Sequence, residues 1–232
     1  MSFKLIMPMA GNGSRFTNAG YTLPKPLIDV RGKPMFVQAV ENIGMTFDDM
    51  IFIIQKSHNI KEKVLSYYST AKIVELDGVT EGAACSVLLA DKYLDENDSV
   101  FVSNCDQLIS WDQLDFKSKM KYDGVIVTFD CPEKDPKWSF AKVDISGRVT
   151  AVAEKDPISD IASTGHYYWS KWSTYKKSLS DMIENNDRYN NEFYLCPVLS
   201  YTIKQGGHVV NSHASEMHGL GTPEDLEAWL NL

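Results

Sequence analysis

A loop near the N-terminus combines glycines with two basic side chains. Gly11 and Gly13 follow an apolar stretch, and Arg15 and Lys25 lie ten residues apart in the segment "GNGSRFTNAGYTLPKP". Glycines let backbone N–H groups approach a ligand closely, which makes a concave site for anions such as phosphates. Arginine recognises several phosphate oxygens through its planar fork, whereas lysine is a compact charge. These residues indicate a phosphate-binding loop.

The spacing of this loop excludes two common nucleotide motifs. It is neither a "GxGxxG" that opens directly into a helix nor a loop that ends in Gly-Lys-Ser/Thr. A dinucleotide fold and a P-loop ATPase are therefore not supported. The "GNG" alone would also suit a flexible turn, but Pro24 and Pro26 restrict the backbone on either side of Lys25. The lysine is thus expected to be held in place.

The elements around this loop predict an α/β fold. An apolar run over 3–9 ends at the loop, as a buried strand does. Further strands are expected over 50–55, 72–76, 98–106 and 123–130, alternating with helices over 34–44, 59–69 and 82–94. This alternation is typical of a mainly parallel, Rossmann-like central sheet with helices on both faces.

Two loops are expected to share one crevice. Ligands of parallel sheets bind beyond the carboxyl ends of the strands, where the glycine loop and the segment "SNCDQ" with Asp106 both fall. Asp106 could also cap a helix that is expected to begin near Trp111. The crevice prediction instead places its carboxylate opposite the basic loop.

The pattern changes from about Trp138 onward. Alternating apolar and polar residues around Ser146 and Gly147 predict a hairpin, which we interpret as a small antiparallel insertion. Helices are expected over 171–186 and 192–207, followed by a short strand over 208–212 and a last helix that begins at Pro223. We find no repeat or linker, so the 232 residues are interpreted as a single domain.

Composition limits the function classes. The chain is 44% hydrophobic and 23% charged, as soluble globular proteins are, and its net charge of −8 with scattered basic residues argues against nucleic acid as a partner. The four cysteines lack paired spacing, which argues against disulfides or a zinc site and fits a reducing cytosol. We see no signal peptide and no apolar stretch long enough to span a membrane. A cytoplasmic protein without a membrane partner is expected, and a homo-oligomer stays open.

Several motifs together resemble those of one enzyme family. They are "MAGNGSRF", "PKPLIDVRGKPM", "TEGAAC", "NCDQ", "VAEKDPISDIASTGHYYW", "NNEFYLCPV" and "GLGTPEDL". In this the chain resembles the sugar-phosphate nucleotidyltransferases, or NDP-sugar pyrophosphorylases, of the type that serves capsule and surface polysaccharide. The resemblance implies that a sugar 1-phosphate attacks the α-phosphate of an NTP and releases pyrophosphate. Such a displacement needs alignment and charge stabilisation rather than a covalent enzyme intermediate.

The resemblance also implies roles for individual residues. Arg15 would bind the departing pyrophosphate, Lys25 would bridge the phosphates and Asp106 would hold Mg²⁺. The residues implied in nucleotide binding are Ala10, Gly11, Asn12, Gly13, Ser14, Arg15, Lys25, Glu81 and Gly82. Those implied in binding the sugar phosphate are Glu154, Lys155, Gly165 and Glu192. The nucleotide part would then span about 1–130 and the sugar-phosphate part about 131–232.

Departures from the family pattern keep other functions open. "HGLGT" places Gly219 and Leu220 where many relatives carry a second metal-binding aspartate, and Ala141 replaces a glycine that contacts the sugar in some members. A cytidylyltransferase that acts on phosphocholine or another non-sugar phosphomonoester is therefore an alternative. A glycosyltransferase of related fold is another, although such enzymes usually carry Asp-x-Asp where this chain has "NCD". The last alternative is a module that binds a nucleotide without catalysing a reaction.

Three histidines do not indicate a metal site. His208, His213 and His218 recur every five residues. That step alternates faces on a strand and misaligns on a helix, so the three side chains are not expected to converge on one ion.

Overall fold

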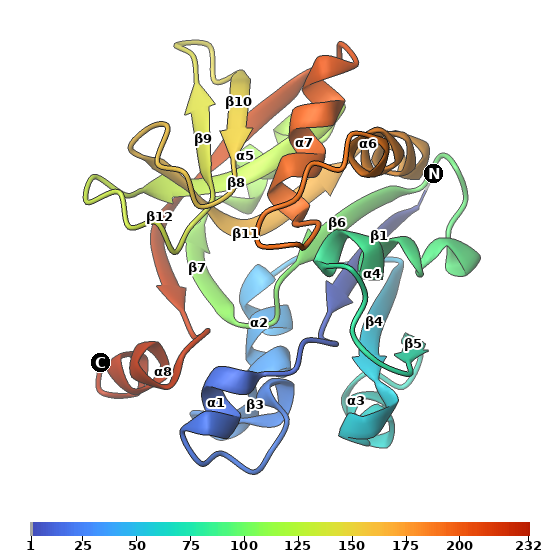
Figure 1. The fold of residues 1–232 in the computed structure, drawn as a ribbon, viewed down its shortest axis with the longest axis vertical. Coiled ribbons are helices and arrows are strands. Elements are labelled where there is room, and N and C mark those ends of the chain that lie inside the picture. Colours follow the sequence, from blue (N-terminus) through green and yellow to red (C-terminus); the bar gives the residue numbers. More distant parts are fainter. Residues whose placement is uncertain (1) are drawn as a thin grey trace.

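The computed structural model describes residues 2–232, and a mixed, mainly parallel sheet forms its centre (Figure 1). The strand order is β5-β4-β1-β6-β11-β8-β12-β7. The bounds of these strands are β1 Phe3–Pro8, β4 Asp49–Gln55, β5 Lys72–Leu76, β6 Ser99–Ser103, β7 Gln107–Trp111, β8 Gly124–Asp130, β11 Ile161–Trp169 and β12 Val209–Gly219. Pairing is parallel from β5 through β6 and between β8 and β12, whereas β11 and β7 are antiparallel to their neighbours. The predicted mainly parallel sheet is confirmed.

Helices cover both faces of the sheet because successive strand residues point to opposite sides. Ile6 packs in a core with α4, α6 and α7, while Leu5 packs in a second core with α2, α3 and α5. The helices are α1 Ser14–Asn18, α2 Met35–Ile43, α3 Lys61–Tyr67, α4 Ala83–Leu88, α5 Gln113–Lys119, α6 Trp172–Glu184, α7 Leu195–Lys204 and α8 Pro223–Leu230. Within residues 2–232, none of the helices combines the length and apolar character needed to cross a bilayer.

Two of the antiparallel strands were not expected from the sequence. β11 lies in the middle of the sheet between β6 and β8, and β7 runs through Trp111, where a helix was expected to begin. Helix α5 begins at Gln113, and the carboxylate of Asp112 caps it by accepting the N–H groups of Leu114 and Asp115. Asp106 is therefore not the cap of this helix.

Two small antiparallel pairs complete the fold, one that branches from the main sheet through the pairing of β9 with β11 and one that is separate from it. β9 Phe140–Val143 and β10 Val149–Ala153 form the predicted hairpin, which turns around Ser146 and Gly147. The Asp144 carboxylate accepts hydrogen bonds from the backbone N–H groups of Ser146 and Arg148, which fixes the turn. β2 Asp29–Val30 and β3 Lys33–Pro34 form a second pair near α1 (Figure 1).

The side chain of Asn42 completes one edge of the main sheet. This residue of α2 accepts the N–H of Ile109 in β7 at 2.7 Å through its Oδ1 and donates to the carbonyl of Ile109 at 3.1 Å through its Nδ2. The carboxamide thus bonds both backbone groups of Ile109. At the opposite edge, β5 is five residues long and exposes Lys72 and Glu75.

A buried ion pair joins the starts of β1 and β6. Lys4 Nζ lies 2.8 Å from Asp98 Oδ2, and the two residues are 9% and 5% exposed. Burial by itself raises the pKa of Asp98, but hydrogen bonds from Lys4, the Asp95 N–H and Ser2 outweigh it and hold that pKa at about 2. The ionised carboxylate is therefore the form that the fold stabilises.

Replacing Asp98 by asparagine is expected to destabilise the protein in a pH-dependent way. Because the buried Lys4 would lose its close carboxylate partner and keep only Asp49, whose Oδ2 lies 3.9 Å away, the free energy of unfolding should fall by about 3 kcal/mol at pH 7. Because the pKa of Asp98 is lower in the folded state than in the unfolded state, its ionised carboxylate stabilises the fold at pH values above the unfolded-state pKa. This stabilisation is lost as the pH falls through the folded-state pKa. The difference between wild type and Asp98→Asn in urea denaturation should thus narrow from pH 4 to pH 2.

The exposed pair of Lys56 and Asp77 provides the control. Asp77→Asn should change the urea midpoint little at any of these pH values, because exposed ion pairs contribute little to stability. A gap between wild type and Asp98→Asn that stays constant down to pH 2 would contradict the proposed role of the buried pair.

Candidate active site

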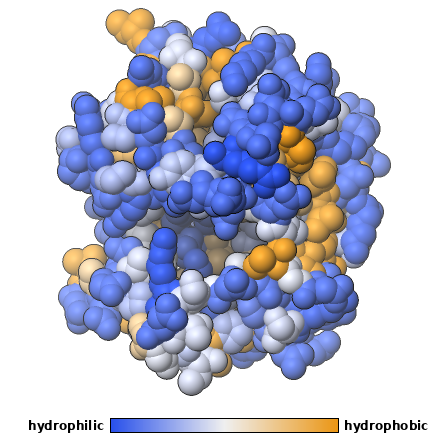
Figure 2. Space-filling model, in the orientation of Figure 1, coloured by the Kyte–Doolittle hydropathy of each residue, from blue (hydrophilic) through white to orange (hydrophobic). Residues whose placement is uncertain are grey.

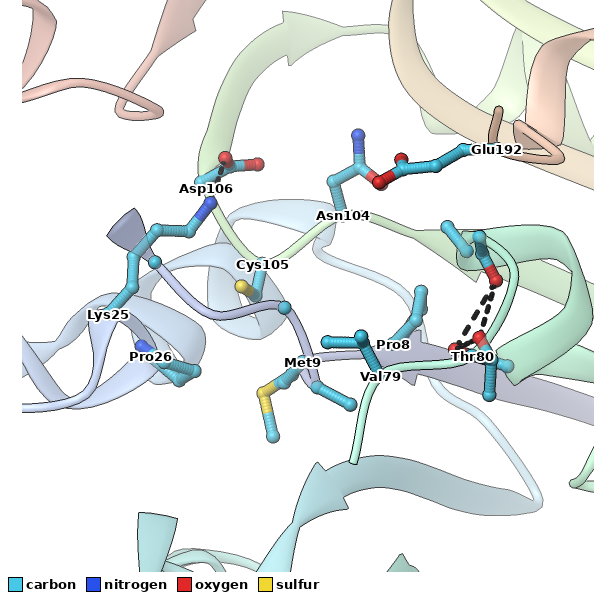
Figure 3. A pocket seen from close by; sticks show the side chains of 16 residues that line it. Pro8, Met9, Lys25, Pro26, Val79, Thr80, Asn104, Cys105, Asp106 and Glu192 are labelled. Atoms are coloured by element: carbon cyan, nitrogen blue, oxygen red, sulfur yellow. Dashed lines mark hydrogen bonds and ion pairs between the residues drawn. The ribbon is translucent and has the colours of Figure 1, made fainter. Parts of the chain in front are cut away.

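The loops that follow β1 and β6 meet because these two strands are parallel neighbours. Lys25 comes from the first loop and Asp106 from the second, and Lys25 Nζ donates a hydrogen bond of 2.5 Å to Asp106 Oδ2 (Figure 3). The two side chains are 24% and 15% exposed. The expectation that both loops share a crevice is confirmed.

The ion pair keeps Lys25 protonated. Burial by itself lowers the pKa of Lys25, but the Asp106 carboxylate outweighs burial, so that this pKa is raised overall. The nearby Arg15 guanidinium has an opposing, smaller effect. Burial raises the pKa of the intervening Cys105 thiol to about 12, which leaves it protonated and not a nucleophile at neutral pH.

The glycine loop is held close to Lys25 by its own backbone and by Gln55. Gly13 adopts a left-handed conformation (φ 62°), and a Cβ atom placed on it would lie 3.3 Å from Lys25 Cβ. Gln55, at the end of β4, donates through Nε2 to the Ala10 carbonyl and to Asn12 Oδ1. Gln55 is buried and was not among the predicted residues. Its signal in the sequence is a polar residue that ends an apolar strand at the same sheet edge.

Two adjoining cavities open beside the ion pair. The smaller, about 290 Å³, is bordered by the glycine loop and by apolar side chains that include Pro8, Met9 and Val79 (Figure 3). The larger is about 510 Å³. Both are bordered by Ala83, Asn104 and Asp106. A hollow with largely hydrophilic borders is visible on this face of the molecule (Figure 2).

The larger cavity contains matched sets of charges. The side chains that line it include three cations and three carboxylates. These are Arg15, Lys137 and Lys155, and Asp106, Glu154 and Asp225. Such a set can bind an anionic phosphate at one place and polar groups at another.

Most of the predicted site residues border one of these cavities. Those at the smaller cavity are Ala10, Gly11, Gly13, Lys25, Gly82, Asp106 and Glu192. Those at the larger cavity are Arg15, Asp106, Glu154, Lys155 and Gly165. Asn12, Ser14 and Glu81 border neither of the two. Glu192 borders the smaller cavity together with the glycine loop (Figure 3), and not the larger cavity with the other predicted sugar-phosphate residues.

Glu81 is engaged in a contact between two loops. Its carboxylate lies 2.5 Å from Arg188 Nη2, and the Arg188 guanidinium packs over the Phe193 ring at 4.0 Å. The backbone of Glu81 accepts the N–H of Phe193. Gly82 is required next to it because any Cβ there would collide with the Phe193 backbone. The pair Glu81-Gly82 therefore positions the loop over 186–194 and does not direct the Glu81 carboxylate into the cavity.

Glu154 and Lys155 enter the larger cavity from the end of β10. Burial raises the pKa of Glu154, although Ser139 donates a 2.5 Å hydrogen bond to it and Lys155 is near. Lys155 Nζ lies 4.9 Å from the centre of the Tyr194 ring and donates to the Tyr194 hydroxyl at 3.4 Å. Tyr194 was not predicted, because its position beside Lys155 depends on a contact across 39 residues.

The metal-binding potential of the site rests on Asp106. Within residues 2–232, no three His, Cys, Asp or Glu side chains cluster as metal ligands. A Cβ on Gly219 would lie 2.8 Å from the Trp138 ring, so Trp138 fills the space that a side chain there would need. One carboxylate nonetheless fits Mg²⁺, which often takes one or two protein carboxylates and completes its shell with water and substrate phosphates.

Comparisons with known proteins agree with this geometry. The family model for nucleotidyl transferases matches residues 4–229. A crystal structure of the nucleoside-diphosphate-sugar pyrophosphorylase from Vibrio cholerae RC9 superposes with a TM-score of 0.86 at 25% identity, covering 98% of this chain and 100% of that chain. The UDP-glucose pyrophosphorylase structure, at a TM-score of 0.78 and 19% identity over 100% of this chain and 98% of that chain, shares the fold.

Curated relatives match over part of their length. The bifunctional protein GlmU of Methanocaldococcus jannaschii is 29% identical over 170 residues, which are 72% of this chain and 40% of that protein. The mannose-1-phosphate guanyltransferase of Aspergillus oryzae is 28% identical over 135 residues, 53% of this chain and 36% of that protein. The chain thus spans less than half the length of these relatives. With nearly all of its residues matched by the family model, and with a basic glycine loop facing Asp106 across the sheet edge, the chain belongs to the nucleotidyl transferase family.

Proposed function

We propose that this chain joins an NTP to a sugar 1-phosphate, giving an NDP-sugar and pyrophosphate. The observation that carries this proposal is the Lys25–Asp106 pair, which lies where the two cavities adjoin. A glycine-loop cavity on one side and a cation-lined cavity on the other are what a two-substrate phosphoryl displacement requires. The names of the relatives, a nucleoside-diphosphate-sugar pyrophosphorylase and a mannose-1-phosphate guanyltransferase, support the choice of acceptor.

The reaction is a single displacement at the α-phosphorus. An oxygen of the acceptor phosphate forms a new P–O bond, while the bond from the α-phosphorus to the bridging oxygen breaks and its electron pair leaves with pyrophosphate. The base would lie against Val79 and the loop backbone at Ala10 and Gly11. The acceptor would lie in the larger cavity, so that the two reacting phosphates meet near Asp106.

Two cations stabilise the charge that this displacement moves. Lys25 is protonated and would pass from Asp106 to the phosphate oxygens when an NTP binds. Arg15, at the start of α1, would hold the pyrophosphate through its guanidinium. Asp106 would hold Mg²⁺, which neutralises charge on phosphate oxygens when it is bound. We place this chemistry in the cytoplasm and assign its product to surface polysaccharide synthesis.

The proposal predicts pyrophosphate release from a defined pair of substrates. Purified protein should release pyrophosphate when an NTP, Mg²⁺ and a sugar 1-phosphate are supplied together, with each NTP assayed against a panel of sugar phosphates. Lys25→Ala and Arg15→Ala should each reduce turnover by at least ~100-fold, the scale for removal of one transition-state charge contact.

Lys56→Ala is the matched control, because Lys56 is an exposed lysine paired with Asp77 and borders neither cavity. Its turnover should stay within twofold of the wild type. Turnover of Lys25→Ala and Arg15→Ala at the wild-type level would exclude the loop mechanism. Folded wild type that binds NTP and releases no pyrophosphate with any acceptor would exclude the transfer reaction.

Asp106→Asn tests the metal assignment. Loss of the carboxylate should raise the Mg²⁺ concentration needed for half-maximal turnover by about tenfold or more, because the remaining amide is a weaker ligand. Binding of Mn²⁺ in the presence of NTP, followed by electron paramagnetic resonance, should weaken in parallel. An unchanged metal titration in both assays would place the ligand elsewhere. Asp77→Asn, at an exposed aspartate that borders neither cavity, serves as the control and should leave both metal titrations unchanged.

A further inference from the structure

We infer that Gln107 contacts the acceptor directly and selects a phosphomonoester that carries hydrogen-bond donors, such as hydroxyl groups or a primary ammonium. The inference rests on the proposed function, since it concerns the acceptor cavity of that reaction. It excludes a fully methylated ammonium, as in phosphocholine, as the preferred acceptor group.

Gln107 has a buried polar atom without a hydrogen-bond partner in residues 2–232. The residue begins β7 directly after Asp106 and is 8% exposed. It lines the larger cavity, and its Oε1 is buried and accepts no hydrogen bond from the residues that the structure describes. A buried amide oxygen without a partner is destabilising, because it has lost its hydrogen bond to water and gained none in the protein. A ligand that donates a hydrogen bond there would recover this free energy.

Gly165 leaves the space in which the Gln107 side chain lies. Gly165 has φ +78°, which other residues rarely adopt, and any Cβ on it would collide with Gln107 Oε1. Gly165 lies within an irregularity of β11, between Ser163 and Tyr167 in the pairing with β8. The Gln107 amide is therefore held against the β11 backbone, at the border of the larger cavity.

Glu154 presents a second acceptor group in the same cavity. Ser139 donates to Glu154 Oε2, and burial raises the pKa of this carboxyl. Acceptor oxygens on Gln107 and Glu154 together require donors on the ligand. Hydroxyl groups and N–H groups satisfy that requirement, whereas a trimethylammonium offers neither.

Two of the aromatic rings that line the cavity already carry cations of the protein. Lys137 Nζ lies 4.8 Å from the centre of the Trp138 ring, and Lys155 Nζ lies 4.9 Å from that of Tyr194. Methylated ammonium groups are usually bound over such rings. Here they would meet lysine charges of the same sign, which instead suit the phosphate of the acceptor.

The test compares matched acceptors and a near-isosteric variant. Dissociation constants would be measured by calorimetry for a sugar 1-phosphate, its monodeoxy analogues, phosphoethanolamine and phosphocholine, with wild type and Gln107→Met. We expect a donor-bearing acceptor to bind the wild type at least tenfold more tightly than phosphocholine. Gln107→Met should weaken that acceptor about tenfold, while the thermal shift given by NTP stays unchanged and reports an intact fold.

One monodeoxy analogue should identify the group that Gln107 binds. With the wild type, this analogue should bind about tenfold more weakly than the parent compound. With Gln107→Met, the analogue and the parent should bind equally tightly, because the variant already lacks the hydrogen bond that the analogue cannot make. The wild-type half of this comparison does not depend on how the variant folds.

Three outcomes would overturn the inference. The first is that phosphocholine binds as tightly as the donor-bearing acceptors. The second is that Gln107→Met binds the acceptor with unchanged affinity. The third is that the wild type binds no donor-bearing acceptor. The affinities are measured without turnover, so this test of Gln107 is independent of whether the protein catalyses the transfer reaction. Tight, Gln107-dependent acceptor binding without pyrophosphate release would overturn the proposed reaction and leave the assignment of Gln107 standing.

Discussion

The parallel pairing of β1 with β6 is the constraint on which the candidate site depends. It brings Lys25 and Asp106, 81 residues apart in the chain, to a 2.5 Å contact at one sheet edge. The opposite ends of the same strands are tied by the buried pair of Lys4 and Asp98. Each end of this strand pair thus carries one ion pair, in which β1 or the loop after it supplies the lysine and a residue next to β6 supplies the aspartate. One of these pairs stabilises the fold, and the other faces the cavities.

Charge at the site is local rather than a property of the whole chain. The protein carries a net charge of −8, which disfavours the approach of phosphates from a distance. The larger cavity nevertheless presents three cations to an anion, namely Arg15, Lys137 and Lys155. Arg15 lies at the start of α1, Lys137 lies beside Trp138 and Asp225, and Lys155 lies beside Tyr194. Affinity for an anion therefore has to come from contacts at short range, where arginine and lysine can bond phosphate oxygens directly.

The N-terminal half was predictable because its signals are local. Apolar strands that end in polar loops alternate with amphipathic helices, so the positions of Lys25 and Asp106 at one edge follow from parallel topology. β11 was not predictable in the same way. Ser163, Thr164 and His166 are polar yet buried. In the folded state the Ser163 hydroxyl bonds to the Tyr167 hydroxyl, and the Thr164 hydroxyl bonds to Nδ1 of His166. Such a segment does not read as an apolar core strand.

The site residues that escaped prediction owe their roles to distant partners. Gln55 bonds to a loop 45 residues away, and the Gln107 amide lies where Gly165 of β11 leaves room for it. For Glu81 the resemblance implied a contact with the nucleobase. In the structure its carboxylate is bonded by Arg188, which lies 107 residues later in the chain. Motif resemblance pointed to loops that border the two cavities, and the tertiary contacts decide which side chains of those loops face them.

The two edges of the sheet also bear on how copies of this chain meet. An unpaired edge strand is a template on which another strand can add, and long flat edges favour aggregation. At β7 the Asn42 carboxamide already occupies both backbone groups of Ile109. At β5 the strand is short, and Lys72 and Glu75 are exposed along it. Neither edge therefore favours continuation of the sheet from one molecule into the next.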